Sequence, residues 1–185
     1  MLAALGLATK QIVRPVIEIF TRILVIPGGA IAGGFYMLWL VLAKRFVPKF
    51  GSGIFFCFVQ ALVVLILPFG SHGIFTFITY SLPGLVVDLI ELLNRKNKNA
   101  FLFSVLDGAA ANLVGSIAVS IFLFNMPIEI MLFVMVLAIL SGNIGGIIAH
   151  LIMKQVKSPL LQTAIIESDI ITNQEQLSEE KVVVD

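Results

Sequence analysis

Five short breaks divide the sequence into six apolar stretches, and this pattern limits the fold more than any other feature. The breaks read "IPGGAIAGG", "KRFVPKFGSG", "PFGSHG", "NRKNKN" and "NMP", and each carries Pro, Gly or Asn, the residues that interrupt helices. A helix needs about 20 mostly apolar residues to cross a bilayer. We therefore predict an all-α integral membrane protein, a bundle of six transmembrane helices at about residues 1–22, 29–43, 53–69, 73–93, 101–124 and 127–153.

The composition agrees with a lipid environment. Hydrophobic residues make up 59% of the 185 residues and charged residues 12%, and a soluble domain of this size has too little interior to hide that much apolar surface. The formal net charge is +1 with no basic stripe, which argues against a nucleic-acid partner. Cys57 is the single cysteine, so a disulfide framework and a Cys-rich metal site are excluded, and we expect a free structural thiol.

Basic residues follow alternate stretches and predict the orientation. The segments "PFGSHG" and "NMPIE", which follow the third and fifth stretches, contain no Lys or Arg. The basic residues lie after the second, fourth and sixth stretches: Lys44, Arg45, Lys49, Arg95, Lys96, Lys98, Lys154 and Lys157. Because positive residues stay on the cytoplasmic side, we place both termini in the cytoplasm. Residues 1–157 are then a membrane domain and residues 158–185 a polar cytoplasmic tail, loose or partly helical. No phosphate-binding glycine loop is present, so another chain must hydrolyse nucleotide if transport is driven.

Small residues recur four apart within several stretches. The examples are Ala4–Ala8, Gly29–Gly33, Ala30–Gly34, Ala111–Gly115 and Ala138–Gly142–Gly146. Such spacing marks close helix contacts in membranes. In the fifth and sixth stretches we expect these small residues to pack the bundle internally. In the first stretch Lys10 and Arg14 follow the apolar start instead of preceding it. That order is not the order of a secretory signal peptide, so we expect an uncleaved helix.

Together these features resemble a known family. Six short spans, both ends inside, "ALGLA" from Ala4 to Ala8, "IPGGAIAGGFYMLW" and "GSGIFFCFVQALV" are similar to the substrate-binding (S) component of energy-coupling-factor (ECF) vitamin importers, over about residues 1–157. The resemblance implies a multi-pass protein of a prokaryotic plasma membrane. It also implies that the face of Ala4 and Ala8 docks on a transmembrane coupling subunit driven by a pair of ATPases. A water-soluble vitamin or precursor would bind in the outer half of the bundle, capped by the loop at about residues 14–30.

Polar side chains inside the stretches are the candidate ligands for that molecule, because a polar group in a span needs a partner, a cavity or a substrate. We predict a substrate-binding pocket with aromatic walls and a few polar groups, suited to a small heteroaromatic molecule: Arg14 at the rim, Tyr36, Trp39, Gln60, His72, Thr76, Tyr80 and Asn112. Trp39 is equally consistent with an interfacial anchor, Gln60 and Asn112 with hydrogen bonds across helices, and His72 with a solvated turn. Thiamine-type precursors, riboflavin, pyridoxal and pteridines all fit such a lining.

Three carboxylates near the cytoplasmic ends suggest other functions. Asp88, Glu91 and Asp107 are compatible with a metal site or proton relay, but we expect ion pairs with the nearby Arg95, Lys96 and Lys98. A small membrane enzyme using these carboxylates and a divalent ion on a lipid-linked phosphate is one alternative. A non-catalytic membrane scaffold is another. We favour a binding subunit that is not an enzyme and carries no metal or cofactor.

Overall fold

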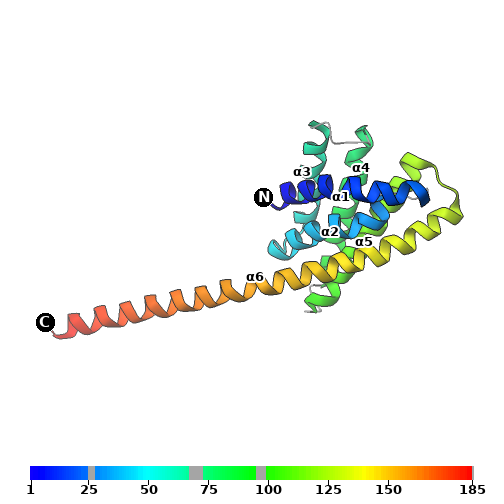
Figure 1. The fold of residues 1–185 in the computed structure, drawn as a ribbon. Coiled ribbons are helices and arrows are strands. Elements are labelled where there is room, and N and C mark those ends of the chain that lie inside the picture. Colours follow the sequence, from blue (N-terminus) through cyan, green and yellow to red (C-terminus); the bar gives the residue numbers. More distant parts are fainter. Residues whose placement is uncertain (25–27, 67–72, 95–98, 185) are drawn as a thin grey trace. The chain divides into compact units, whose positions relative to one another are not determined.

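The computed structural model describes residues 1–24, 28–66, 73–94 and 99–184, with side chains for most of these up to residue 159. Within these residues there are six α-helices and no strand (Figure 1): α1 (Leu2–Leu24), α2 (Gly28–Phe46), α3 (Ser52–Ile66), α4 (Thr76–Asn94), α5 (Ala100–Val119) and α6 (Ile128–Val184). A 3₁₀ turn, Gly73–Phe75, precedes α4, and a π-helical turn, Ser120–Phe124, extends α5. The prediction of an all-α protein with six helices is confirmed.

Three of the described helices are long and apolar enough to cross a bilayer, over Thr76–Leu93, Ala100–Phe124 and Ile128–Lys157. The helix α3 is equally apolar in character but has 15 residues. Charged residues interrupt α1, whereas four glycines and a terminal Lys-Arg pair lower the hydropathy of α2. The chain is an all-α membrane protein. The crossing by α1 to α3, and the side on which each terminus lies, stay predictions.

The chain forms two compact units, Met1–His150 and Leu151–Asp185. In the second unit α6 continues to Val184 and includes Pro159. The tail was expected to be loose or partly helical, and it is helical because residues 160–184 contain no Gly or Pro and many good helix formers. The predicted division between a membrane domain and a cytoplasmic tail at residue 157 stays a prediction.

In the first unit α2 is the helix with the most neighbours, since it contacts α1, α3, α4 and α5, and α3 also lies beside α4 (Figure 1). Glycines permit the closest approaches. The backbone N–H of Gly34 donates to Ser141 Oγ of α6 at 2.9 Å, and Ser141 Oγ donates to the Ile31 carbonyl at 2.5 Å. A Cβ at Gly34 would collide with the Ser141 carbonyl oxygen. This contact explains why α2 needs a small residue there.

Glycines also allow the backbones of α5 and α6 to lie in close contact. A Cβ on Gly108 would collide with the Gly142 carbonyl, and one on Gly146 would lie 2.8 Å from the Cα of Val105. Ala111 and Ala138 are completely buried. The predicted internal packing role of the small residues in the fifth and sixth stretches is therefore confirmed. Cys57 is also free and buried, as expected for a structural thiol.

Candidate functional site

A cavity of about 600 Å³ lies within the first unit. Its lining comes from residues 6–21 of α1, residues 28–40 of α2, the middle and later part of α3, the first half of α4 and the end of α5. Its volume falls in the range of small-molecule binding pockets, about 300–1,000 Å³. Five of the eight predicted binding residues line it: Arg14, Tyr36, Gln60, Tyr80 and Asn112. The structure thus brings together side chains from five helices that are far apart in the sequence.

One face of α1 supplies the charged part of the lining. We call Lys10, Arg14, Glu18 and Thr21 the polar row, and all four line the cavity. They are spaced four, four and three residues apart, so they share one side of the helix. A helix with these residues in a bilayer turns them toward a cavity, because charged groups facing lipid are costly.

The opposite face of α1 is apolar and exposed. We call Ala4, Ala8, Ile12, Val16 and Ile19 the outward stripe, and all five are exposed. The three larger side chains are 74%, 56% and 68% exposed in chain order. Between the two faces, Gly6 packs closely against α3, where an added Cβ would lie 2.6 Å from Gln60 Nε2. The helix α1 therefore has a polar face that lines the cavity and an exposed apolar face.

Lys10 occupies the middle of the cavity wall. Its ammonium donates a hydrogen bond to the Tyr80 hydroxyl. The same nitrogen lies 4.3 Å from the centre of the Tyr80 ring and 5.5 Å from the centre of the Tyr36 ring. Aromatic faces attract a cation at such distances. Lys10 thereby connects α1 with α2 and α4 at the cavity.

Arg14 Nε donates to Glu18 Oε1 at 2.6 Å, so these two charges of the polar row form an ion pair along the helix. The two amides of the cavity also bond across helices. Gln60 Nε2 donates to the Ala3 carbonyl at 3.2 Å. Asn112 Nδ2 donates to the Ala30 carbonyl at 3.2 Å and to the Ala138 carbonyl at 2.8 Å. Both amides thus have the cross-helix bonds that were one of their two interpretations, while they also line the cavity.

Trp39 and Thr76 do not line this cavity. Trp39 Nε1 donates to Thr9 Oγ1 at 3.1 Å and its ring packs against a buried cluster around Leu40. Thr76 is fully buried, and its hydroxyl has no hydrogen-bond partner among the described residues. His72, also a predicted ligand, lies outside the described residues.

The predicted capping loop at residues 14–30 is largely helical. Residues 14–24 belong to α1 and residues 28–30 to α2, and the intervening residues 25–27 lie outside the described chain. The helical period of the polar row explains the difference, since it continues through Thr21.

Sequence reasoning missed several cavity residues, of which Lys10 is the most consequential; the others include Glu18, Thr21, Thr79 and Ser116. The spacing of Lys10 from Arg14 and Glu18 is the signal that could have found it, because residues four apart share a helix face. Its tyrosine partners come from other helices, and the spacing alone does not identify them.

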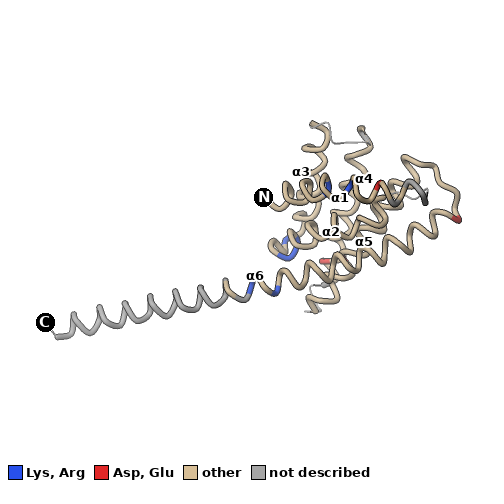
Figure 2. Tube along the Cα trace, in the orientation of Figure 1, with Lys and Arg blue, Asp and Glu red and all other residues tan. Residues whose placement is uncertain are grey.

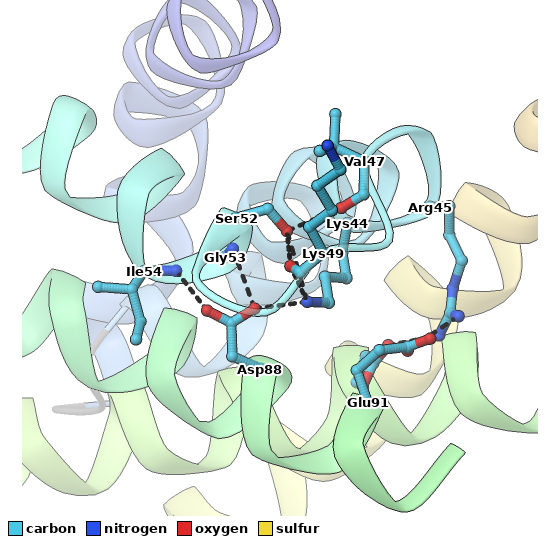
Figure 3. A network of polar contacts seen from close by, with 10 residues as sticks. Lys44, Arg45, Val47, Lys49, Ser52, Gly53, Ile54, Asp88 and Glu91 are labelled. Carbon is cyan, nitrogen blue, oxygen red and sulfur yellow. Dashed lines mark hydrogen bonds and ion pairs between the residues drawn. The ribbon is translucent and has the colours of Figure 1, made fainter. Parts of the chain in front are cut away.

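A second group of charges lies at the end of α2, where Figure 2 shows the basic last turn of that helix. Lys44 Nζ donates to Asp88 Oδ1 at 2.6 Å and to the Lys49 carbonyl at 2.8 Å. The two carboxylate oxygens of Asp88 also accept the backbone N–H groups of Gly53 and Ile54, at 3.1 and 2.9 Å (Figure 3). Asp88 therefore closes the amino end of α3, whose first N–H groups lack partners within the helix.

Arg45 holds the other two carboxylates of this group. Its guanidinium donates to Glu91 Oε2 at 3.1 Å and to Asp107 Oδ2 at 2.5 Å. All three carboxylates therefore form ion pairs, with Lys44 and Arg45 of α2 as the described partners, and the pairing expected with Arg95, Lys96 and Lys98 stays a prediction. The predicted partners Arg95, Lys96 and Lys98 lie outside the described residues. In the part of the chain that the structure describes, no three His, Cys, Asp or Glu side chains are grouped to hold a metal ion.

Comparison with known proteins identifies the family. The profile of the family described as ABC-type cobalt transport system, permease component, matches residues 1–114. That region is more than half of the chain and contains α1 to α4 and most of α5, hence most of the cavity wall. No curated protein and no solved structure matches the sequence. The chain therefore belongs to the family of permease components of ABC-type cobalt transport systems, and it is a membrane component of an ABC-type transporter.

Proposed function

We propose that this chain is the substrate-capturing S component of an ECF-type importer for a water-soluble vitamin or vitamin precursor. The observation that carries the proposal is the division of α1 into two faces. Its polar row lines a cavity of about 600 Å³, and its outward stripe is exposed and apolar. One helix thus combines a ligand-binding surface with a surface that a membrane partner can cover.

The outward stripe supports docking on a coupling subunit. Its first two members, Ala4 and Ala8, are small and exposed. Small residues let two helix backbones approach closely in lipid, where packing replaces the hydrophobic effect as the force of association. Ile12, Val16 and Ile19 extend the same stripe along α1. A coupling subunit bound to this stripe would leave the cavity side of α1 free.

The cavity lining favours a small organic molecule. Two tyrosine rings, the amides of Gln60 and Asn112 and an ammonium group surround a largely apolar space. Such sites orient a ring by stacking and by a few hydrogen bonds. The family description names cobalt, but cobalt and related ions prefer imidazole, thiolate or carboxylate ligands. The described lining offers one carboxylate, Glu18, which is paired with Arg14, and one thiol, Cys57.

The membrane-enzyme alternative has less support. It requires Asp88, Glu91 and Asp107 to hold a divalent ion, yet each carboxylate accepts a hydrogen bond from Lys44 or Arg45. Asp88 additionally caps α3. Releasing these groups to a metal would leave the fully buried Lys44 and the largely buried Arg45 without their counter-ions, which is strongly unfavourable.

A ligand screen on the purified chain in detergent tests the proposal. The panel contains thiamine, thiamine precursors, riboflavin, pyridoxal and pteridines, with cobalt chloride as a separate arm. At 100 times Kd, one-site binding adds about 2.7 kcal/mol of stability, which is visible as a higher Tm. Tyr36→Leu removes a ring from the cavity, and Phe35→Leu is the matched control because Phe35 is the exposed neighbour on α2.

We expect one organic compound to raise the Tm of the native chain and of Phe35→Leu but not of Tyr36→Leu. A folded protein that responds to no organic compound, or to cobalt alone, would contradict the proposal.

A further inference from the structure

Lys10 is a lysine inside the bundle whose hydrogen-bonding capacity is mostly unused. An ammonium group has three N–H donors. Among the described residues one acceptor is present, the Tyr80 hydroxyl, and the tyrosine rings of positions 36 and 80 supply the remaining contacts of the charge. Two donors of a group that lines the cavity are therefore available to a ligand.

The charge of Lys10 also lacks a counter-ion in the described part of the chain. The nearest charges along α1 are Arg14 and Glu18, which pair with each other at 2.6 Å. No described carboxylate lies within ion-pair distance of Lys10 Nζ, since the described ion pairs join other residues. The described charges of the cavity thus leave one positive charge uncompensated.

Lys44 is a buried lysine of the same protein whose charge and N–H donors all have partners. Its ammonium is fully buried and has a carboxylate, Asp88, at 2.6 Å, with the Lys49 carbonyl and Ser52 Oγ as further acceptors at 2.8 and 3.4 Å. Lys10 has neither the carboxylate nor the additional acceptors. An ionisable group inside a membrane bundle without such partners indicates a functional position.

We propose that Lys10 determines the substrate specificity of the cavity by binding the anionic group of a small molecule that carries a carboxylate or phosphate. This inference rests on the proposed function and names the substrate class of the same cavity. An anion supplies the missing counter-charge and accepts the two unused N–H groups. Tyr36 and Tyr80, which flank the ammonium, provide adjoining aromatic walls for the rest of the molecule.

Neutral and cationic ligands fit the charge distribution less well. A cation would be repelled by Lys10 at close range in a medium of low dielectric constant. A neutral ligand would remove water from the ammonium and leave its charge without compensation. Only an anion improves the electrostatic environment of Lys10 on binding.

The test compares pairs of compounds that differ in one anionic group: nicotinate with nicotinamide, pyridoxine phosphate with pyridoxine, and thiamine monophosphate with thiamine. The first pair reports on a carboxylate and the other two on a phosphate. Binding is measured by isothermal titration calorimetry on the detergent-solubilised native chain and on three variants, Lys10→Met, Lys10→Arg and Lys154→Met. Lys154→Met is the control, because Lys154 is an exposed lysine. The Tm of each variant without ligand is measured in parallel.

We expect the native chain and Lys154→Met to bind the anionic member of at least one pair more tightly than its partner. Lys10→Met should lose about 10- to 100-fold of that affinity, the usual effect of a hydrogen bond to a charged group. Lys10→Arg should retain part of the preference for the anion. Without ligand, Lys10→Met should melt no lower than the native chain, because it removes a charge that has no counter-ion.

Three outcomes would overturn the inference. If the member without the anionic group binds at least as tightly and Lys10→Met binds it unchanged, the capture function stands and the anionic substrate class is wrong. If Lys10→Met lowers the ligand-free Tm and weakens both members of a pair equally, Lys10 is a structural tie between α1 and α4. If the folded native chain binds no organic compound at all, including the wider vitamin panel, the proposed function fails and this inference fails with it.

Discussion

Lys44 and Asp88 form an ion pair at 2.6 Å in which both side chains are completely buried. The pair joins the end of α2 to α4, and the same carboxylate caps the amino end of α3. Three helices thus depend on one carboxylate and one ammonium. This junction lies at the end of α2, whereas residues between positions 28 and 40 of the same helix line the cavity.

Breaking this pair should destabilise the bundle strongly. Lys44→Met leaves Asp88 buried without its cation and should cost about 3–5 kcal/mol of unfolding free energy. Denaturant unfolding in detergent measures the loss. The double variant Lys44→Met/Asp88→Asn should cost less than the sum of the two single changes, because the charges interact directly. Lys49→Met, at an exposed side chain, is the control and should change stability by less than about 0.5 kcal/mol. Additive single effects would contradict a direct interaction.

Glycine substitutions test the contact between α5 and α6. Gly108→Ala places a methyl group against the backbone of Gly142 and Gly146 and should cost about 1–3 kcal/mol through overpacking. Gly29→Ala is the matched change, since nothing lies within 4 Å of a Cβ at that position, and Ala is a better helix former than Gly. Thermal unfolding should therefore separate the two variants. An equal Tm for both would show that the helices are not in close contact at Gly108.

The six helices could be predicted because breaks that carry Pro, Gly or Asn separate six mostly apolar stretches of the sequence. Tertiary partners could not. The described partner of Glu91 is Arg45 on another helix, and no spacing in the sequence indicates that pair. The local pair of Glu91 with Arg95 stays a prediction, because Arg95 lies outside the described residues. The tyrosines around Lys10 likewise come from α2 and α4. The π-helical turn at Ser120–Phe124 was also not predicted. One extra residue in a single turn does not change the spacing of apolar residues enough to be recognised in the sequence.

The outward stripe of α1 should act in coupling and not in substrate binding. Ala8→Trp adds a large ring where a coupling subunit would approach, so co-purification with that subunit and ATP-driven uptake in liposomes should be lost. Binding by the isolated chain should be unchanged, because Ala8 does not line the cavity. Leu132→Trp, at an exposed position of α6, is the control and should couple normally. Normal uptake by Ala8→Trp would contradict the proposal that the outward stripe docks on the coupling subunit.

Cys57 offers a probe of the cavity from inside. It is 4% exposed and contributes to the cavity lining. A membrane-permeant maleimide should therefore label the folded chain slowly, and a bound substrate should slow the labelling further by filling the space. Mass spectrometry of the intact chain follows the reaction, with the detergent-denatured chain as the fully reactive reference. Labelling of the folded chain as fast as that reference would contradict the burial of Cys57.

The central claim is that the chain binds a small organic molecule. It is tested most directly by identifying the ligand that co-purifies with the chain from its own membrane. The measurement is mass spectrometry of small molecules released on denaturation, with metal analysis of the same samples, for the native chain, Tyr36→Leu and Phe35→Leu. We predict about one organic molecule per chain in the native protein and in Phe35→Leu, and its loss from Tyr36→Leu. Stoichiometric cobalt with no organic molecule, or the same organic content in Tyr36→Leu, would contradict the account.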